Sequence, residues 1–283
     1  MRIDLHTHSS VSDGTDTPTQ LVRKAAEQGL DVIGLTDHDT FDGLREAKLA
    51  AEGFDLTVLP GLEMSCQLDG ASVHLLAYGC DPHDEPLLNE LTRVRVGRTG
   101  RLPEMLAKLA DLGMPLTEAE IAEQVGASPS LGRPHVADAM VAKGYVVDRQ
   151  QAFDEYLYDG GPAYANRYSC DIRRGIELVR RAKGVPVIAH PWGRGRDREL
   201  TPAVLSELTM EYRLEGVEVD HPDHDAQTRH RLRPLAASLG LLPLGSSDHH
   251  GLGKVGHELG CETTADDVYD ELVRRIRSRG GKL

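Results

Sequence analysis

Two histidines close the first apolar run of the chain, residues 1–8, with one threonine between them. Successive side chains of a β-strand point to opposite faces, so His6 and His8 would point the same way, away from the face that carries Ile3 and Leu5. Two imidazoles that share a face can bind one metal ion. The pair alone is equally compatible with a strand that ends in two surface histidines, so the rest of the chain has to decide.

Further apolar runs alternate with amphipathic helical stretches, which is typical of parallel βα units. Strands are expected near residues 32–35, 56–59, 71–78, 185–189, 216–219 and 241–244. Thr17 and Thr117 each precede a helical stretch and are expected to form capping boxes with Gln20 and Glu120. With the first run, this makes seven strands and predicts a barrel-like α/β domain.

The alternation stops near residue 84 and resumes near residue 165. Between these points the pattern is helical and polar, with helices expected over 87–112 and 117–125, after Pro134, and around 150–157. We therefore predict a barrel domain of residues 1–84 and 165–283, interrupted by a small helical insertion domain of residues 85–164.

Composition places the chain among ordinary globular proteins, with 40% hydrophobic and 27% charged residues over 283 positions. No apolar run approaches the roughly 20 residues of a membrane span. The first residues lead directly into a strand, so no signal peptide is expected. A cytoplasmic location is therefore expected. The four cysteines are scattered, which is typical of reduced thiols.

The formal net charge of −13 argues against a surface that binds long nucleic acids. It does not exclude a small anionic substrate, because bound divalent metals would reverse the sign of the local field.

Side chains of metal-ligand type occur in or just after six of the expected strands. They are His6, His8, Asp13, His38, Glu63, His74, His190, Asp248 and His250. The C-terminal ends of barrel strands converge on one face, so these nine groups would meet in one cleft. Imidazole and carboxylate without thiolate suit Mn²⁺, Fe²⁺ or Zn²⁺. Nine ligands exceed what one ion uses, and two or three clustered ions can hydrolyse phosphate esters.

The same residues resemble the motifs of the polymerase and histidinol phosphatase (PHP) family. The motifs are His6-Thr7-His8, Asp13, Thr36-Asp37-His38, Gly61-Leu62-Glu63, His74, Ala189-His190-Pro191 and Ser247-Asp248-His249-His250. The resemblance implies a distorted seven-stranded (βα)7 TIM-like barrel and a phosphoesterase that uses a metal-bridging hydroxide. It also implies two or three divalent ions, of which Mn²⁺ is most expected.

The resemblance further implies how the ligands divide among the ions. His6, His8, Glu63 and Asp248 would hold the first; Asp13, His38 and His250 the second; and Glu63, His74 and His190 the third. Glu63 would bridge. The doublet His249-His250 leaves two candidates for one position, and the Ser-Asp-x-His spacing favours His250.

The helical insertion and the segment at residues 131–135 are similar to one branch of the family, the TrpH-like nucleotide phosphatases and 5′-to-3′ exoribonucleases. This similarity implies a small phosphorylated nucleotide as substrate, such as a 3′,5′-bisphosphonucleotide or a nucleoside monophosphate. Short RNA 5′ ends remain an open alternative, whereas membranes and long nucleic acids are not expected as partners.

Several residues near the expected cleft are candidates for catalysis or substrate binding, and each has a plainer interpretation. Arg133 and His135 begin a helix, where backbone N–H groups favour anions, so Arg133 could hold a second phosphate or be a surface cation. His221 and His224 follow a strand and could contact substrate or lie in a solvated loop. Asp37 could orient an imidazole, carry a proton as a catalytic group together with His224, or be a loop residue.

Four arginines at positions 93, 95, 98 and 101 follow helical spacing. A solvated helix face is expected, and steering of a nucleotide into the cleft is the alternative. Tyr164 and Tyr168 are expected to pack at the junction with the insertion, although either could stack on a base.

Three other functions remain open. A histidinol-phosphate phosphatase would share the metal site, but the insertion argues against it. A non-catalytic metal-bound module is the second alternative, and the presence of ligand-type residues at all nine positions argues against it. An amidohydrolase barrel also opens with a His-x-His strand, but the lysine expected near a strand end is missing between Lys48 and Lys108 and between Lys183 and Lys254.

Overall fold

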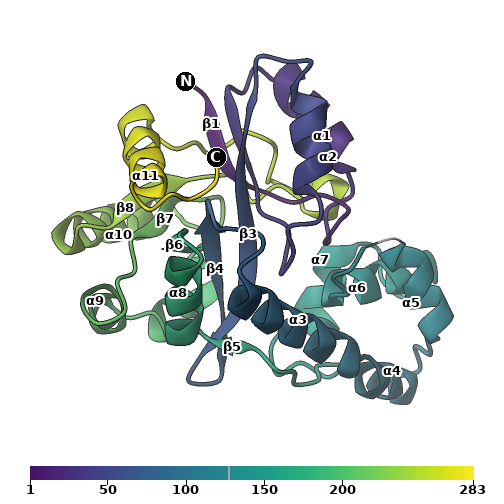
Figure 1. The fold of residues 1–283 in the computed structure, drawn as a ribbon. Helices are drawn as coiled ribbons and strands as arrows, with labels where there is room; N and C mark the ends of the chain where they lie inside the picture. The colour runs from purple at the N-terminus through teal and green to yellow at the C-terminus, as the bar shows by residue number, and fades with distance from the viewer. Residues whose placement is uncertain (127) are drawn as a thin grey trace.

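The protein is a barrel-like α/β structure, seen in a computed structural model that describes residues 1–126 and 128–283 (Figure 1). Its sheet follows the order β1 (Ile3–Thr7), β2 (Val32–Leu35), β3 (Thr57–Leu68), β4 (Ala71–Tyr78), β6 (Val185–Ile188), β7 (Gly216–Asp220) and β8 (Leu242–Gly245). The two ends of this order meet where Thr7 bridges His249, and His8 N donates to His249 O at 2.8 Å. The predicted fold class, a distorted seven-stranded barrel, is confirmed.

Helices cover the outside of this sheet. They are α1 (Pro18–Glu27), α2 (Leu44–Ala51), α8 (Ile172–Arg181), α9 (Pro202–Met210), α10 (Ala226–Leu239) and α11 (Asp266–Ser278). In α8 the buried residues Ile172, Ile176 and Val179 recur at helical spacing and join the core around β3 and β4. The capping box of Thr17 with Gln20 is present at the start of α1.

The third strand is longer than expected, and this changes the topology. A strand over 56–59 was expected to end near Glu63, but β3 continues to Leu68 and pairs with β4 in antiparallel register. Asp69 and Gly70 connect them with φ of 50° and 92°, as a tight two-residue hairpin turn requires. Because no helix is needed in such a turn, the βα alternation fails at this one step and β4 runs against both of its neighbours.

A two-residue strand, β5 (Cys170–Asp171), adds to the outer part of β3. It was not expected from the sequence, because two residues are too few to show a periodicity. Its pairing ties the chain that returns from the insertion to the β3–β4 hairpin.

The helices between the two halves of the barrel are α3 (Glu85–Gly100), α4 (Leu102–Asp111), α5 (Glu118–Val125), α6 (Arg133–Ala142) and α7 (Arg149–Ala152), with a π-helical turn at Phe153–Leu157. The single helix expected over 87–112 is divided at Arg101, because Pro103 cannot donate a hydrogen bond to the preceding turn. The capping box of Thr117 with Glu120 is present.

Helices α4 to α7 share a hydrophobic core of their own, which includes Met105, Ile121 and Met140, and they lie together at one side of the molecule (Figure 1). Helix α3 instead packs on the barrel through Leu87 and Leu91. The separate core supports the predicted insertion domain, although its boundaries at residues 85 and 164 stay a prediction. In the described part of the chain, no helix has the length and apolar character needed to cross a membrane.

Candidate metal centre

Glu63 lies at the centre of a buried group of histidines at one mouth of the barrel. Its carboxylate comes within 3.3 Å of five imidazoles contributed by four different strands or their ends. Oε2 is 3.3 Å from His6, 3.1 Å from His8 and 3.2 Å from His38, and Oε1 is 2.7 Å from His74 and 3.2 Å from His190. Side chains far apart in sequence are thus gathered around one carboxylate, as the barrel argument predicts.

Two further carboxylates complete the group. Asp13 Oδ1 lies 3.3 Å from His250 Nε2, and Asp13 Oδ2 lies 3.6 Å from His38 Nε2. Asp248 Oδ1 lies 3.4 Å from His6 and 3.5 Å from His8. All nine side chains predicted as metal ligands therefore contact one another in a single cluster.

The donor atoms fall into small sets with the spacing of metal sites. Five sets among the described residues have all their donor atoms within 4.8 Å of one another: His8, Asp13, His38 and His250; His6, His8, Glu63 and Asp248; His38, Glu63 and His74; His6, Glu218 and His221; and His221, Asp248 and His257. This composition of imidazole and carboxylate suits Mn²⁺, Fe²⁺ or Zn²⁺.

The hydrogen bonding of the cluster also fits cations. His38 Nδ1 is buried without a hydrogen-bond partner, which is costly unless another group binds it. Burial lowers the pKa of His38 and of His190 to about 3, so both rings are neutral at neutral pH and can offer a lone pair. Despite its burial, the pKa of Glu63 is held well below its usual value by the imidazoles around it, chiefly His74, so this carboxylate is charged. The cluster thus fits divalent metal ions.

Three residues at this mouth have left-handed backbone conformations. Asp39, His190 and Asp248 have φ of 58°, 29° and 53°. Such conformations cost roughly 1–3 kcal/mol in residues other than glycine and concentrate at functional sites. Here they turn the chain sharply at the points where β2, β6 and β8 end, and so direct His38, His190 and Asp248 into the cluster.

Asp37, predicted as catalytic, lies under the first loop. Its carboxylate accepts hydrogen bonds from Ser9 N at 2.8 Å, Ser9 Oγ at 2.7 Å and Ser12 Oγ at 2.7 Å. Ser12 Oγ in turn lies 3.4 Å from His8 Nδ1. The geometry favours orientation of His8 through Ser12, whereas proton transfer by Asp37 stays an untested prediction.

His221 and His224 differ in their surroundings. His221 Nε2 is buried without a hydrogen-bond partner and lies 3.5 Å from Asp248 Oδ2, so this ring faces the cluster. His224 places Nδ1 at 3.0 Å from Val219 O, and its Nε2 accepts from Trp192 N at 3.3 Å. Both nitrogens of His224 thus contact backbone, which does not favour its predicted roles in catalysis and substrate binding.

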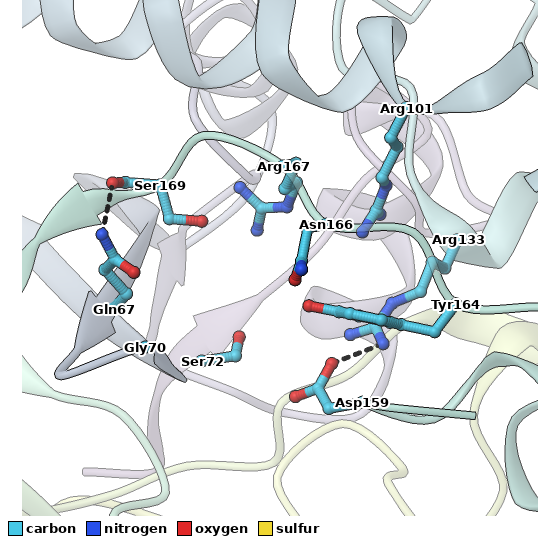
Figure 2. Close-up of a pocket in the computed structure, with 10 residues that line it drawn as sticks. All are labelled: Gln67, Gly70, Ser72, Arg101, Arg133, Asp159, Tyr164, Asn166, Arg167 and Ser169. Atoms are coloured by element: carbon cyan, nitrogen blue, oxygen red, sulfur yellow. Dashed lines mark hydrogen bonds and ion pairs between the residues drawn. The ribbon is translucent and has the colours of Figure 1, made fainter. Parts of the chain in front are cut away.

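Arg133 and His135 begin α6, beside a pocket drawn in Figure 2. Arg133 Nη1 donates to Leu157 O at 2.8 Å and to Asp159 Oδ1 at 2.6 Å. His135 Nδ1 accepts from Gly132 N at 3.0 Å, and burial lowers the pKa of this ring. His135 therefore caps its own helix, and its predicted contact with substrate stays a prediction.

The expectation of a solvated arginine face on α3 is wrong for two of its members. Arg98 and Arg101 are only 5% and 6% exposed. Arg98 Nε donates to Asp39 Oδ2 at 2.8 Å. Helical spacing predicted which side these residues share, but it could not show that the barrel and the insertion cover that side.

Three residues at the cluster were not predicted: Glu218, Lys254 and His257, whose ring lies with His221 and Asp248 in one of these sets. Glu218 in β7 is fully buried, and its Oε1 lies 3.0 Å from His6 Nδ1 while its Oε2 accepts from His190 N at 2.7 Å. Lys254 Nζ forms an ion pair with Asp248 Oδ2. A glutamate between Val217 and Val219 was the available signal, because alternate residues of a barrel strand face the interior.

Glu218→Gln is expected to weaken metal binding or activity about 10- to 100-fold, as removal of a carboxylate behind a ligating histidine typically does. Unlike the carboxylate, the amide carries no negative charge to stabilise the N–H of His6, so it would hold the orientation of this imidazole less firmly. Titration of Mn²⁺ into wild type and variant would measure the change. Glu177→Gln on the exposed side of α8 is the control, and equal Mn²⁺ affinity in all three proteins would contradict an orienting role.

Comparisons with known proteins agree with this geometry. A family model described as the PHP domain matches residues 4–92. A 3′,5′-nucleoside bisphosphate phosphatase of Chromobacterium violaceum is 30% identical over 280 residues, covering 98% of this chain and 97% of that protein. A 5′-3′ exoribonuclease of Haemophilus influenzae is 34% identical over 190 residues, covering 67% of this chain and 69% of that protein.

A solved structure gives the same result. A protein of Bifidobacterium adolescentis named as a metal-dependent phosphoesterase superposes with a TM-score of 0.91 at 35% identity, covering 96% of each chain. The similarity spans nearly the whole length, including the helices between the barrel halves. The chain is therefore a member of the PHP family.

Proposed function

We propose that this protein is a metal-dependent phosphoester hydrolase that acts on small nucleotides. The observation that carries the proposal is the contact of the single buried carboxylate of Glu63 with five imidazoles. Its relatives are named as a phosphatase and an exoribonuclease, and both activities break phosphate ester bonds. We assign metal binding to the nine clustered side chains and place Glu63 as the bridging ligand. Mn²⁺ is the ion we expect, with Fe²⁺ or Zn²⁺ as alternatives.

Bound divalent ions would supply Lewis acidity, lowering the pKa of water and neutralising the phosphoryl oxygens. The chain itself would then need no nucleophile. Glu218 would hold the ring of His6, and Ser12 would steady His8. Lys254, paired with Asp248 at the edge of the cluster, would add a positive charge beside the bound phosphate.

The substrate proposed is a mono- or bisphosphorylated nucleotide. The relative that covers almost all of this chain is named for a 3′,5′-nucleoside bisphosphate, and the formal net charge of −13 disfavours a long polyanion. Short RNA 5′ ends are the second candidate, because a relative covering two thirds of the chain is named as an exoribonuclease. Histidinol phosphate is the third and is less favoured, since neither of these relatives is named for it.

A hydrolysis panel tests the proposal. It contains adenosine 3′,5′-bisphosphate, AMP, histidinol phosphate and a 5′-phosphorylated oligonucleotide, each with Mn²⁺. We expect release of phosphate or nucleotide from at least one nucleotide substrate, loss of that activity with a chelator, and recovery when Mn²⁺ is restored. Turnover of histidinol phosphate alone would reject the nucleotide assignment, and activity that survives complete metal removal would reject the metal mechanism.

A further inference from the structure

Residues 247–260 form a loop between β8 and α11, at the edge of the cluster, and we name it the lysine loop. The two ends of this loop are held together. Asp4 accepts hydrogen bonds from Ser247 N at 3.0 Å and from Gly260 N at 2.8 Å. The ends are thus fixed to the barrel, and movement of the loop would be confined to its middle part.

The tip of the lysine loop makes little apolar contact with the rest of the protein. Leu252 and Val255 are 92% and 91% exposed. Gly251 and Gly256 lie on either side of them with φ of 63° and 78°, a conformation that glycine adopts without strain. The tip is therefore not held by packing of these side chains, and polar contacts have to fix its position.

Polar contacts with two segments of the barrel fasten the tip. Leu252 N donates to Thr15 Oγ1 at 2.8 Å. Lys254 turns inward, its side chain is 16% exposed, and its Nζ forms an ion pair with Asp248 Oδ2. This ion pair joins the tip of the loop to one of the proposed metal ligands.

The two carboxylate oxygens of Asp248 face different groups. Oδ1 lies 3.4 Å from His6 Nε2 and 3.5 Å from His8 Nε2, on the side of the cluster. Oδ2 binds Lys254, on the side of the loop. Asp248 can therefore offer Oδ1 to a metal ion while Oδ2 interacts with a cation of the chain itself.

His221 faces the same oxygen as Lys254. Its Nδ1 accepts from Asp223 N at 3.0 Å, so the proton of this ring lies on Nε2. His221 Nε2 is 3.5 Å from Asp248 Oδ2 and is buried without a hydrogen-bond partner among the described residues. If Lys254 moved away, a small approach of the ring would give Oδ2 another donor.

The pair of Lys254 with Asp248 would be weaker in the metal-loaded protein. Without metal, the side chain of Asp248 is only 4% exposed and its carboxylate needs a counter-charge. A divalent ion at Oδ1 would supply that charge and would repel the ammonium of Lys254. Lysine suits a change of partner, because its ammonium is a compact charge on a flexible four-carbon stem.

A phosphate is the anion whose chemistry fits the freed ammonium. A phosphate monoester carries a charge of roughly −1.5 to −2 at pH 7 and three strong acceptor oxygens. It would come to the cluster as the group that is cleaved, beside the position that Lys254 already occupies. Lysine binds phosphate as a point charge, so no fixed bidentate geometry is required of the loop.

We propose that Lys254 exchanges Asp248 for the scissile phosphate of the substrate, and that the lysine loop thereby closes over the bound phosphate. This inference rests on the proposed function, which places that phosphate at the cluster. The tip is held at Asp248 in the unloaded protein, released when metal binds, and held again when phosphate binds. Because Lys254 contacts the phosphate that is cleaved, its effect is the same for every phosphate monoester, whatever the leaving group.

Hydrogen–deuterium exchange of full-length wild type and Lys254→Met tests the proposal. The reporters are the amides of Leu252 and Gly253, which donate to Thr15 Oγ1 and His250 O. In wild type, Mn²⁺ is expected to speed exchange of these amides by at least about fivefold, and inorganic phosphate added with Mn²⁺ is expected to reverse the change. In Lys254→Met, exchange should be fast from the start and should respond to neither addition.

Lys143→Met is the matched control, because it removes an exposed lysine that is paired with Glu120 in the insertion. It should behave as wild type does. Two results overturn the proposal. One is unchanged or slower exchange of the wild-type tip when metal analysis shows bound Mn²⁺. The other is protection by phosphate that is equal in wild type and Lys254→Met.

Steady-state kinetics give a second test of the contact with phosphate. With Mn²⁺, kcat/KM of Lys254→Met is expected to fall about 10- to 100-fold for AMP and for 4-nitrophenyl phosphate alike, because one charge-assisted hydrogen bond to phosphate is lost. Lys254→Arg keeps the charge and should recover most of the loss. A loss for one substrate only, or an equal loss in Lys254→Arg and Lys254→Met, rejects the contact.

The exchange measurement distinguishes failure of this proposal from failure of the proposed function. If wild type hydrolyses no phosphate ester, the proposed function fails, whereas exchange that rises with Mn²⁺ and falls with phosphate still supports the change of partner. If wild type is active and Lys254→Met matches it in kcat/KM and in exchange, the proposed function stands and the role of Lys254 fails. A wild type that binds no Mn²⁺ rejects both.

Discussion

Glu63→Gln should abolish turnover and release bound metal in the same protein. The substitution keeps the shape of the side chain but removes the negative charge that faces His6, His8, His38, His74 and His190. An amide offers one acceptor oxygen in place of two, so it would be a poor ligand at a position proposed to bridge two ions. A bound metal would contribute several kcal/mol of transition-state stabilisation, so its loss would correspond to a rate decrease of about 10³-fold or more.

The measurements are kcat with saturating Mn²⁺ and the metal content of the purified protein by mass spectrometry. Glu27→Gln, exposed at the end of α1, is the control for the chemical change alone. Full metal content with lost turnover would give Glu63 a role other than metal binding. Retention of both properties would mean that the cluster is not organised around this carboxylate.

Arg98→Met is expected to destabilise the fold by about 3–5 kcal/mol, the usual cost when one partner of a buried ion pair is removed. Arg98 Nε donates to Asp39 Oδ2 at 2.8 Å, and both side chains are almost fully buried. Asp39 also accepts from Ser65 N at 2.7 Å. Without Arg98, the buried carboxylate between β2 and β3 would keep its charge but lose its counter-charge.

Urea unfolding followed by circular dichroism measures this effect. Arg93→Met on the same helix is the matched control. Arg93 also forms an ion pair, with Glu90, but its side chain is 63% exposed, and such surface pairs contribute only about 0–1 kcal/mol. The double variant Arg98→Met/Asp39→Asn should recover part of the loss. A change below about 1 kcal/mol in Arg98→Met would show that Asp39 does not depend on this arginine.

Local patterns were enough to predict most of the fold. The period-two and helical patterns predicted all seven strands of the barrel order, and the capping boxes of Thr17 and Thr117 are present. The patterns failed at the end of β3. Its extension to Leu68 pairs with β4 across a two-residue hairpin turn and with the distant β5, and a strand over 56–59 was expected instead.

The cluster could be predicted from the sequence because the C-terminal ends of barrel strands converge, whatever segments lie between them. His38, His190 and Asp248 each follow a strand directly, and the fold alone brings them together. The environment of the arginines could not be predicted in this way. Helical spacing placed Arg98 and Arg101 on one side of a helix, but only the tertiary packing shows that this side is covered and that both side chains are buried.

The β3–β4 hairpin holds its turn at a fixed distance from the metal cluster. Gly61–Leu68 of β3 pair with all of β4, so a backbone ladder, rather than an irregular loop, sets how far the turn at Asp69-Gly70 lies from Glu63 and His74. Lengthening or shortening this hairpin by two residues on each strand would move its turn relative to Glu63 and His74 without changing which side chains of the two strands face the cluster.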